Sequence, residues 1–454
     1  MTMLPLIHGD DPQAPVAWAH GAPISRRRYL ADVARVAEQL PRAGHMLNLS
    51  HDRYRFALGL GAALLRGQDN LLPPNHTPDM VARLRTLFPG TYLVGDADGG
   101  ALHAVQWPTT APSDNPAELA SRSTASVDES HIAAHVLTSG STGNPVPYAK
   151  AWGLLWRNTQ VGAQRLAAQL GRPSLAGVSL VATVPAQHMY GFESSVLVAL
   201  LGAVAFETSR PFYPADICAA LSRIPRPRIL VTTPLHLKTL LDSKLSVPAL
   251  DLCVCATALL APLLAARAEA AFDAPLMEIY GCTEAGQVAT RRTTQGPTWL
   301  TYEGVAISGD TEHAVASGGH VPQPTPLADV LEIVDPTHFR LLGRSNDLIN
   351  IAGKRSSLSH LNFHLNAIDG VHDGAFWLPP QEATPDVAVV RLVAFVVAPQ
   401  LTRDALLAAL RERLDPAFLP RRIVWLDALP RDPSGKLPSA RLAELAARLV
   451  SGGA

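Results

Sequence analysis

Apolar runs of strand length alternate with amphipathic helical stretches along the middle of the chain. The three pairs are residues 179–184 with 194–201, residues 228–232 with 235–241, and residues 252–256 with 259–272. Two more helical stretches precede them, at residues 24–40, with Ser25 as the expected N-cap, and at residues 53–65. This alternation predicts an α/β fold with a largely parallel sheet, in which loops at the strand ends form a ligand site.

The pattern changes in the last third of the chain. Residues 318–328 are rich in glycine and proline and predict irregular connecting chain, and strands are expected at 330–334 and 338–342. Beyond Gly343 the order becomes helix 358–368, strand 391–397, helix 403–414 and strand 422–426, which is typical of a compact α+β unit. We therefore predict two domains, residues 1–343 and residues 344–454.

Composition narrows the class of protein. The 454 residues are 47% hydrophobic and 17% charged, which favours a globular chain with more than one domain. A formal net charge of −1 gives no electrostatic reason to expect a nucleic acid as the main partner. The N-terminus lacks the features of a signal peptide, and no apolar window reaches the roughly 18 residues of a membrane span.

Cysteine usage points to a reducing setting. Two of the four cysteines, Cys253 and Cys255, alternate along an apolar strand and should point the same way into the core. No second cluster of ligands stands at a spacing that would predict a metal site. We therefore expect core cysteines and a cytoplasmic protein.

One loop carries the first candidate chemistry. The apolar run 132–137 is followed by residues 138–145, which include four hydroxyl residues, two glycines and a proline. Backbone N–H groups of such a loop, with hydroxyl donors between them, can bind the phosphates of a nucleotide. Gly140 and Gly143 are too close together for a Walker loop and no Lys-Ser or Lys-Thr follows, which argues against a Walker-type kinase. A flexible Gly/Ser turn is the alternative.

Four further segments hold candidate polar groups, and each alone fits an ordinary turn, a surface aspartate, a linker or a solvated lysine. They are Tyr280-Gly281-Cys282-Thr283-Glu284, Asp329, the connector that begins Gly343-Arg344-Ser345-Asn346, and the turn Pro433-Ser434-Gly435-Lys436. Their order changes this interpretation. A hydroxyl-rich loop, then Y-G-x-T-E, a G-R connector and a late G-K turn together resemble the motif series of the ANL adenylate-forming enzymes, over about residues 132–441.

The resemblance implies a function and a set of site residues. Enzymes of this superfamily activate a carboxylic acid with ATP and Mg²⁺, giving an acyl-adenylate and pyrophosphate, and then pass the acyl group to a thiol. It also implies a large N-terminal adenylating domain with parallel-rich sheets and flanking helices, and a small mobile C-terminal domain that carries the catalytic lysine.

Each motif position takes a role from the resemblance. The phosphate loop would be Thr138, Ser139, Gly140, Ser141, Thr142 and Gly143, and the segment along adenine would be Ala256, Thr257 and Ala258. Tyr280 and Gly281 would border adenine, Thr283 would bind the α-phosphate, Glu284 would hold the metal, and Asp329 and Arg344 would contact the ribose or phosphate. Lys436 would bridge the acid carboxylate and the α-phosphate, as a flexible ammonium can.

This sequence departs from the family pattern at several positions. Val146 stands where a lysine usually follows the phosphate loop, and Lys150, four residues later, is the candidate to replace its charge. The usual T-G-D before the ribose aspartate reads Leu327-Ala328-Asp329, and the hinge position is Asn346 in place of an aspartate.

The acid and the acceptor are the least determined features. His188, Tyr190 and Phe192 resemble a segment that borders the acyl pocket, and an aromatic wall favours a flat aromatic acid. The chain resembles the compact ligases of aryl polyene and xanthomonadin pigment synthesis, which implies 3- or 4-hydroxybenzoate as the acid and an acyl carrier protein as the acceptor. Basic residues Arg411, Arg413, Arg421 and Arg422 could meet an acidic carrier protein or could be a solvated face. The alternatives are an aryl- or acyl-CoA ligase and a non-catalytic nucleotide- or carrier-binding module.

Overall fold

The computed structural model describes residues 2–96, 103–108, 125–138, 146–344, 348–351, 354–379, 392–432 and 435–450. Within these ranges an eleven-stranded sheet has the order β20-β21-β16-β15-β14-β13-β12-β10-β11-β2-β3. Its strands are β2 (Pro15–Ala19), β3 (Ala22–Ser25), β10 (Ser179–Ala182), β11 (Ala205–Glu207), β12 (Arg228–Thr232), β13 (Leu252–Cys255), β14 (Leu276–Cys282), β15 (Gly286–Arg291), β16 (Thr298–Thr301), β20 (Asp329–Asp335) and β21 (His338–Arg344). Strands β2 and β10 to β14 run parallel, which confirms the predicted architecture.

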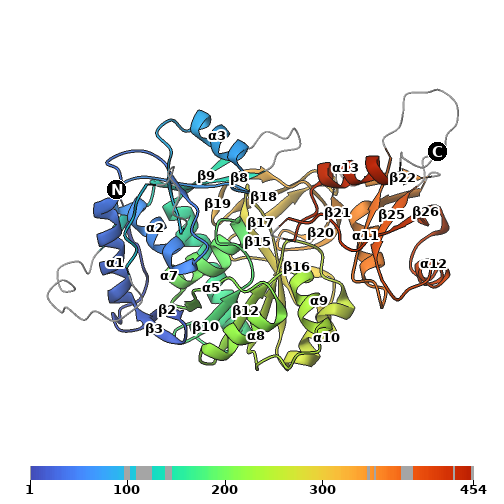
Figure 1. The fold of residues 1–454 in the computed structure, drawn as a ribbon, viewed down its shortest axis with the longest axis horizontal. Coiled ribbons are helices and arrows are strands. Elements are labelled where there is room, and N and C mark those ends of the chain that lie inside the picture. Colours follow the sequence, from blue (N-terminus) through green and yellow to red (C-terminus); the bar gives the residue numbers. More distant parts are fainter. Residues whose placement is uncertain are drawn as a thin grey trace.

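Helices cover both faces of the parallel strands. The helices α8 (Pro214–Arg223), α9 (Pro234–Asp242) and α10 (Pro262–Phe272) lie together on one face (Figure 1). Their apolar side chains pack with Leu230, Cys253 and Cys255, while Ile229 and Val254 belong to the core on the other face. Consecutive side chains of a strand point to opposite faces, so these strands are apolar on both. Cys253 and Cys255 therefore share one core and are free thiols, as predicted.

A second, five-stranded sheet with the order β6-β4-β5-β8-β9 carries the hydroxyl-rich motif. Its strands are β4 (Met46–Asn48), β5 (Asn70–Leu72), β6 (Tyr92–Val94), β8 (Ile132–Thr138) and β9 (Val146–Ala151). The pair β1 (Met3–Pro5) and β7 (Ser126–Asp128) and the helices α1 (Arg26–Gln39), α2 (Arg53–Leu65), α3 (Pro78–Leu87) and α5 (Trp152–Gln169) accompany this part of the chain. The helices predicted at residues 24–40 and 53–65 are thereby confirmed.

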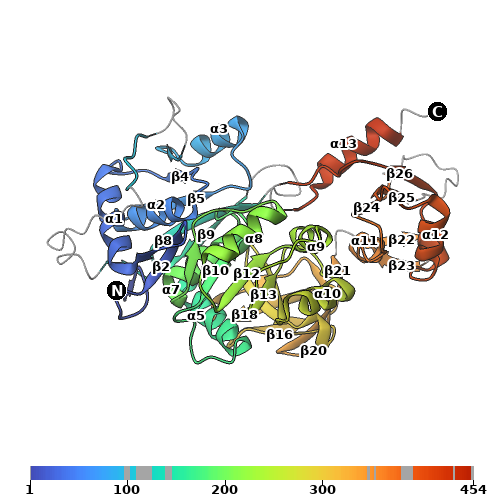
Figure 2. The same cartoon turned by 60° about the horizontal axis from the view of Figure 1, so that its bottom comes forward.

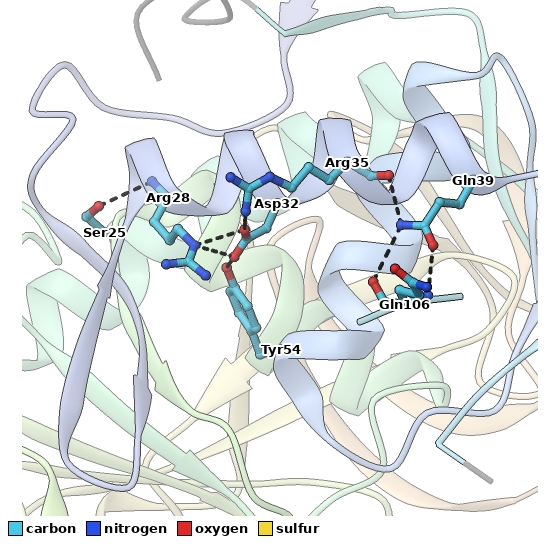
Figure 3. Close-up of polar contacts among 7 residues, drawn as sticks. All are labelled: Ser25, Arg28, Asp32, Arg35, Gln39, Tyr54 and Gln106. Atoms are coloured by element: carbon cyan, nitrogen blue, oxygen red, sulfur yellow. Dashed lines mark hydrogen bonds and ion pairs between the residues drawn. The ribbon is translucent and has the colours of Figure 1, made fainter. Parts of the chain in front are cut away.

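Polar contacts fix α1 against α2 (Figure 3). The Ser25 hydroxyl accepts a hydrogen bond from the Arg28 backbone N–H at 3.2 Å, so Ser25 caps the helix as expected. One turn later Asp32 is buried, and its carboxylate accepts from the Arg28 Nε at 2.8 Å and from the Tyr54 hydroxyl at 2.9 Å. Burial raises the pKa of Asp32, and the bond from Arg28 opposes that shift. The pairing satisfies a charge that would otherwise be costly to bury.

The helix predicted at residues 194–201 is longer than expected. It consists of α6 (Met189–Gly191), a π-helical segment η1 (Phe192–Leu197) and α7 (Val198–Gly202). Wide π-helical turns are rare and occur often at functional sites. This one begins at Phe192, one of the three residues that the sequence analysis placed beside the acid.

The prediction of irregular chain at residues 318–328 is wrong. A three-stranded sheet forms there from β17 (Ala306–Gly309), β18 (Ala314–Gly318) and β19 (Val321–Pro326). The three prolines of β19 are tolerated because β19 is an edge strand, where a missing N–H leaves no partner unsatisfied. A short η2 turn (Thr293–Gln295) lies between β15 and β16.

The C-terminal elements pair only with one another within the described ranges. They are β22 (Leu348–Ile351), β23 (Lys354–Ser357), α11 (Leu358–Asn366), β24 (Asp373–Trp377), β25 (Val393–Val397), α12 (Arg403–Arg411), η4 (Pro416–Phe418), β26 (Arg422–Trp425) and α13 (Ser439–Val450). They have apolar cores of their own and lie at one end of the molecule (Figures 1 and 2). The domain boundary at residues 343/344 stays a prediction, and β21 continues through Arg344. No helix of the described chain is long and apolar enough to cross a membrane.

Candidate active site

Tyr280 lies near the end of β14, where the parallel part of the large sheet meets its antiparallel part. Its ring packs 5.7 Å from the ring of Trp299 and 5.4 Å from that of Phe339, measured between centroids. Its hydroxyl donates a hydrogen bond to the Asp329 carboxylate at 2.7 Å. Aromatic packing and this bond fix the ring in place, so Tyr280 and Asp329, 49 residues apart, form one surface.

Asp329 and Arg344 are brought together by strand register. Asp329 begins β20, Arg344 ends β21, and the two residues are direct partners across the antiparallel pair. Opposite residues in such a pair are close neighbours in the sheet. The structure thus brings together three residues that the sequence assigned to the nucleotide. The side chain of Arg344 and the hinge residue Asn346 lie outside the described part.

The turn after Tyr280 depends on a glycine. A bulge interrupts the pairing of β14 with β15 at Gly281, and a Cβ there would come within 2.3 Å of the Gly286 carbonyl oxygen. Only glycine allows this close approach. The turn presents Thr283, which is partly exposed, and Glu284, which is exposed.

The phosphate-loop motif connects two neighbouring strands. Thr138 is the last residue of β8 and pairs with Val146, the first residue of β9. Residues 139–145, with Ser139, Gly140, Ser141, Thr142 and Gly143, lie outside the described residues, and their predicted role stays a prediction.

Lys150 lies in β9 and is buried. Its ammonium donates a hydrogen bond to the Glu284 backbone carbonyl at 2.9 Å, which ties the β8–β9 hairpin to the Thr283–Glu284 turn. Burial lowers the pKa of Lys150, and the nearby Glu193 carboxyl acts in the opposite direction. The observed contact of Lys150 is therefore with protein, and its service to a phosphate stays a prediction.

The segment predicted to lie along adenine follows β13. Ala256 is buried, Thr257 is partly exposed and Ala258 is exposed. Thr257 has a φ of 82°, a left-handed conformation that is strained for a β-branched residue and is typical of functional loops.

The three residues predicted to border the acid occupy different surroundings. The Tyr190 hydroxyl donates to the carbonyls of Thr232 and Val254, both at 3.1 Å, at the ends of β12 and β13. Phe192 is fully buried, 6.4 Å from the Phe56 ring, and is a core residue. His188 lies just before α6, and burial lowers its pKa to about 4, with the charge of Lys436 acting in the same direction. His188 is therefore neutral at pH 7.

Lys436 is exposed and belongs to a tight turn that reaches the large sheet. The Lys436 backbone N–H donates to the Asp432 carboxylate at 3.0 Å, and the Asp432 N–H donates to the Lys436 carbonyl at 2.8 Å. Gly435, with a φ of 82°, faces the first turn of α9, where an added Cβ would lie 3.6 Å from the Thr233 hydroxyl. The lysine turn thus docks at the carboxyl end of β12, beside His188.

A buried polar group next to the predicted acid-binding residues was missed by the sequence reasoning. Glu193 is buried, and one of its carboxyl oxygens accepts a short hydrogen bond from the Asn158 amide. Burial raises the pKa of Glu193 to about 8, while the charge of Lys150 opposes the shift. A single acidic residue within the apolar stretch 192–206 was the only signal in the sequence.

A hollow on the other side of His188 is rich in donors. Its lining includes Ser50, Arg53, His76 and Arg210, and the Ser50 Oγ, Arg53 Nε and His76 Nε2 atoms are buried without a hydrogen-bond partner among the described residues. Burial lowers the pKa of His76 to about 4, and the charges of His51 and Arg210 add to that shift. Such unsatisfied donors favour a polar ligand with acceptor groups.

The chain is similar to known proteins in sequence and in fold. A family model described as AMP-binding enzyme matches residues 93–345. The 4-coumarate–CoA ligase of Halorhodospira halophila is 30% identical over 309 residues, covering 66% of this chain and 73% of that protein. A 4-coumarate–CoA ligase of Rhodobacter capsulatus is 29% identical over 304 residues, with the same coverage of 66% and 73%. The O-succinylbenzoate coenzyme A synthetase of Bacillus subtilis, solved with AMP, has a TM-score of 0.76 at 17% identity, covering 96% of this chain and 97% of that one.

The match to the family model spans more than half of the chain and includes Tyr280, Thr283, Glu284, Asp329 and Arg344. The chain therefore belongs to the AMP-binding enzyme family of the ANL superfamily, and it is an AMP-forming acid–thiol ligase that activates an acyl or aryl acid with ATP. This sets aside the non-catalytic module considered above. The likeness to the synthetase structure extends the fold match over nearly the whole chain.

Proposed function

We propose that this enzyme activates an aromatic carboxylic acid, 3- or 4-hydroxybenzoate, and transfers it to the phosphopantetheine thiol of an acyl carrier protein, as ligases of aryl polyene and xanthomonadin pigment synthesis do. The observation that carries the proposal is the docking of the Lys436 turn against α9, beside His188 and at the strand ends that also present Tyr280 and Thr283. ATP and carrier proteins are cytoplasmic reactants, so the cytoplasm is the proposed setting.

In the first step a carboxylate oxygen of the acid attacks the α-phosphorus of ATP, and the bond to pyrophosphate breaks. Both reactants are anions, so their approach needs a cation between them. Lys436 supplies this charge from its turn, and Thr283 donates its hydroxyl to the α-phosphate. Asp329 and Arg344 hold the ribose side, and Tyr280 with the Ala256–Thr257–Ala258 segment borders the adenine. The loop Thr138–Gly143 binds the β- and γ-phosphates, with residue 346 as the proposed hinge between residues 1–343 and 344–454.

A Mg²⁺ ion fits the oxygen donors at the Thr283–Glu284 turn. Glu284 is exposed, and its neighbour Thr283 offers a hydroxyl. Carboxylate and phosphate oxygens are the ligands that Mg²⁺ prefers. Glu284 would hold the ion, which would neutralise charge on the departing pyrophosphate.

In the second step the thiol sulfur attacks the acyl carbon, the bond to AMP breaks and the thiol proton is released. The donor-rich hollow beside His188 suits the amide carbonyls of a phosphopantetheine arm, because Ser50 and Arg53 have unused donors there. On the C-terminal unit Arg411 and Arg421 are exposed, and the Arg403 guanidinium contacts the Arg421 carbonyl at 3.1 Å. This basic surface suits an acidic carrier protein.

Coenzyme A is the second candidate acceptor, because the two curated relatives are named as CoA ligases. Both acceptors present the same thiol, so the choice rests on what lies around it. A double charge reversal, Arg411→Glu with Arg421→Glu, should slow loading of a carrier protein about tenfold or more and leave coenzyme A unaffected. Equal effects on both acceptors would favour coenzyme A.

The deciding experiment is pyrophosphate release with ATP and a panel of benzoates, with coenzyme A and a carrier protein offered in parallel. We expect release with hydroxybenzoates and thioester formation on the carrier protein. A panel of aromatic acids that gives no pyrophosphate, while aliphatic acids do, would overturn the aromatic assignment.

A further inference from the structure

A cavity, called the slot below, lies behind the predicted acid-binding residues, between α5, the π-helical segment and the large sheet. Its wall on the sheet side is formed by Val231, Val254 and Ile279. Val254 is the residue whose carbonyl accepts from Tyr190, and Ile279 directly precedes Tyr280. The slot therefore begins where the nucleotide side of the site ends.

The slot is mostly apolar, with one polar end. On α5 it is lined by Gly162, where an added Cβ would lie 3.4 Å from the Gln287 side-chain oxygen. Small residues on one wall and branched aliphatic residues on the other suit a planar ring. The polar end is formed by Glu193 and Gln287.

The two polar groups differ in their capacity for another hydrogen bond. Both polar atoms of Gln287 have protein partners, because its amide nitrogen donates to Ser194 at 3.1 Å and its oxygen accepts from the Tyr302 hydroxyl at 2.9 Å. Glu193 has one oxygen bonded to Asn158, and its second oxygen has no partner among the described residues. The Asn158 side-chain oxygen is likewise buried and unpartnered within the described chain.

A buried carboxyl oxygen that receives no hydrogen bond costs free energy unless a ligand or a water donates one to it. Lys150 lies close enough for its charge to act on Glu193, but its own hydrogen bond goes to the Glu284 carbonyl. The carboxyl is therefore held in the slot by Asn158 and is open toward the space that a ligand would occupy.

We propose that Glu193, positioned by Asn158, accepts a hydrogen bond from a hydroxyl or amino group on the ring of the acid and makes the enzyme select acids that carry such a donor. This rests on the proposed function, because it takes the slot to be the site of the ring. The raised pKa of Glu193 agrees with a carboxyl that is kept away from water.

The test measures equilibrium binding of acids by calorimetry in the absence of ATP. The acids are 3-hydroxybenzoate, 4-hydroxybenzoate, 4-aminobenzoate, 4-methoxybenzoate and benzoate, so that hydroxyl and amino donors are compared with an ether and with no substituent. We expect the wild-type enzyme to bind at least one donor-bearing acid about 10- to 100-fold more tightly than the ether and benzoate.

Three variants test whether Glu193 causes this preference for donor-bearing acids. Glu193→Leu should reduce it to within about threefold, because no acceptor remains, whereas Glu193→Gln keeps an acceptor and should retain part of it. The matched control is Glu332→Gln, which changes an exposed carboxylate on β20 that pairs with Arg340. This variant should bind like wild type. If the leucine variant fails to fold, the glutamine variant and the wild-type profile still decide.

Equal binding of all five acids by wild type would overturn the inference, as would an unchanged preference in Glu193→Leu. Pyrophosphate release, measured separately with the same acids, tests the proposed function. A binding preference without pyrophosphate release would therefore contradict the proposed reaction while supporting the role of Glu193.

Discussion

The nucleotide side of the site and the lysine turn are built in different ways. Tyr280, Asp329 and Arg344 come from three strands of one sheet, joined by strand register and a 2.7 Å hydrogen bond. The turn that carries Lys436 is closed by bonds between residues four positions apart, and it meets the sheet through Gly435. Sheet-built groups are fixed before any ligand arrives, whereas a cation on a docked turn can be withdrawn without disturbing them.

The largest expected effect comes from removing the charge of the lysine turn while the rest of the site stays intact. Lys436→Ala should lower the rate of pyrophosphate release about 100- to 1000-fold, because it removes the cation between two anions. The KM for ATP should change little, since the nucleotide side is intact. Arg441→Ala, at an exposed cation on α13, is the control and should behave like wild type. A rate within threefold of wild type would contradict the role of Lys436.

The second-largest expected effect tests the proposed nucleotide side of the site. Asp329→Ala should raise the KM for ATP about 10- to 100-fold, because it removes a charged acceptor and the hydrogen bond that holds the Tyr280 hydroxyl. Tyr280→Phe keeps the ring and removes only the hydrogen bond, so its effect should be about threefold to tenfold. Steady-state kinetics at saturating acid measure both. Asp335→Ala, at the exposed end of the same strand, should leave KM unchanged.

The support of the lysine turn offers a smaller effect. Arg431 forms a two-pronged ion pair with Asp373 at 2.7 Å and donates to the Gly435 carbonyl at 3.0 Å. Arg431→Met should lower the free energy of unfolding by about 1 kcal/mol and the rate of pyrophosphate release several-fold.

Denaturant unfolding and the pyrophosphate assay check this prediction. Combining Arg431→Met with Asp373→Leu should cost less than the sum of the two single changes, because they share one interaction. A raised KM for ATP would contradict the separation between turn and nucleotide side.

The smallest expected effect is a change in the pKa of His188, which tests whether the lysine turn lies beside His188 in solution. His188 has a pKa of about 4, lowered by burial first and then by the charge of Lys436. Removing that charge in Lys436→Ala should raise the pKa of His188, as followed by NMR titration, and Arg441→Ala should not. An unchanged value would place the turn away from His188.

The same pKa sets a dependence of stability on pH. The unfolded chain takes up the His188 proton at about 6.5, more readily than the folded protein does at about 4. The unfolded state is therefore favoured as the pH falls through this window, and the free energy of unfolding decreases. Wild type should lose more stability than His188→Gln between pH 6.5 and 4.

Much of the fold could be predicted because local pattern and burial agree. The strand at residues 228–232 and the helix at residues 53–65 match their predicted bounds, since the first is a short apolar run and the second a long, almost wholly apolar stretch. The strand at Val321–Pro326 could not be predicted, because its prolines indicate a loop unless the segment is known to lie at a sheet edge.

Site chemistry divides in the same way. Motif order alone indicated Tyr280, Asp329 and Arg344, which a hydrogen bond and strand pairing bring together. Nothing in the order of residues indicated that Glu193 would face a slot beside Gln287, or that Phe192 would be a core residue, because a wide π-helical turn sets which side chains face the sheet.

The sequence by itself determined the class of enzyme and the types of group that serve its reaction, since hydroxyls, carboxylates and a lysine are required by nucleotide and acid chemistry. The tertiary structure decided which of these groups touch one another. Register placed Asp329 opposite Arg344, burial separated Lys150 from solvent, and the docking of Gly435 brought a C-terminal turn to the sheet. Such contacts depend on long-range packing, which local sequence patterns do not encode.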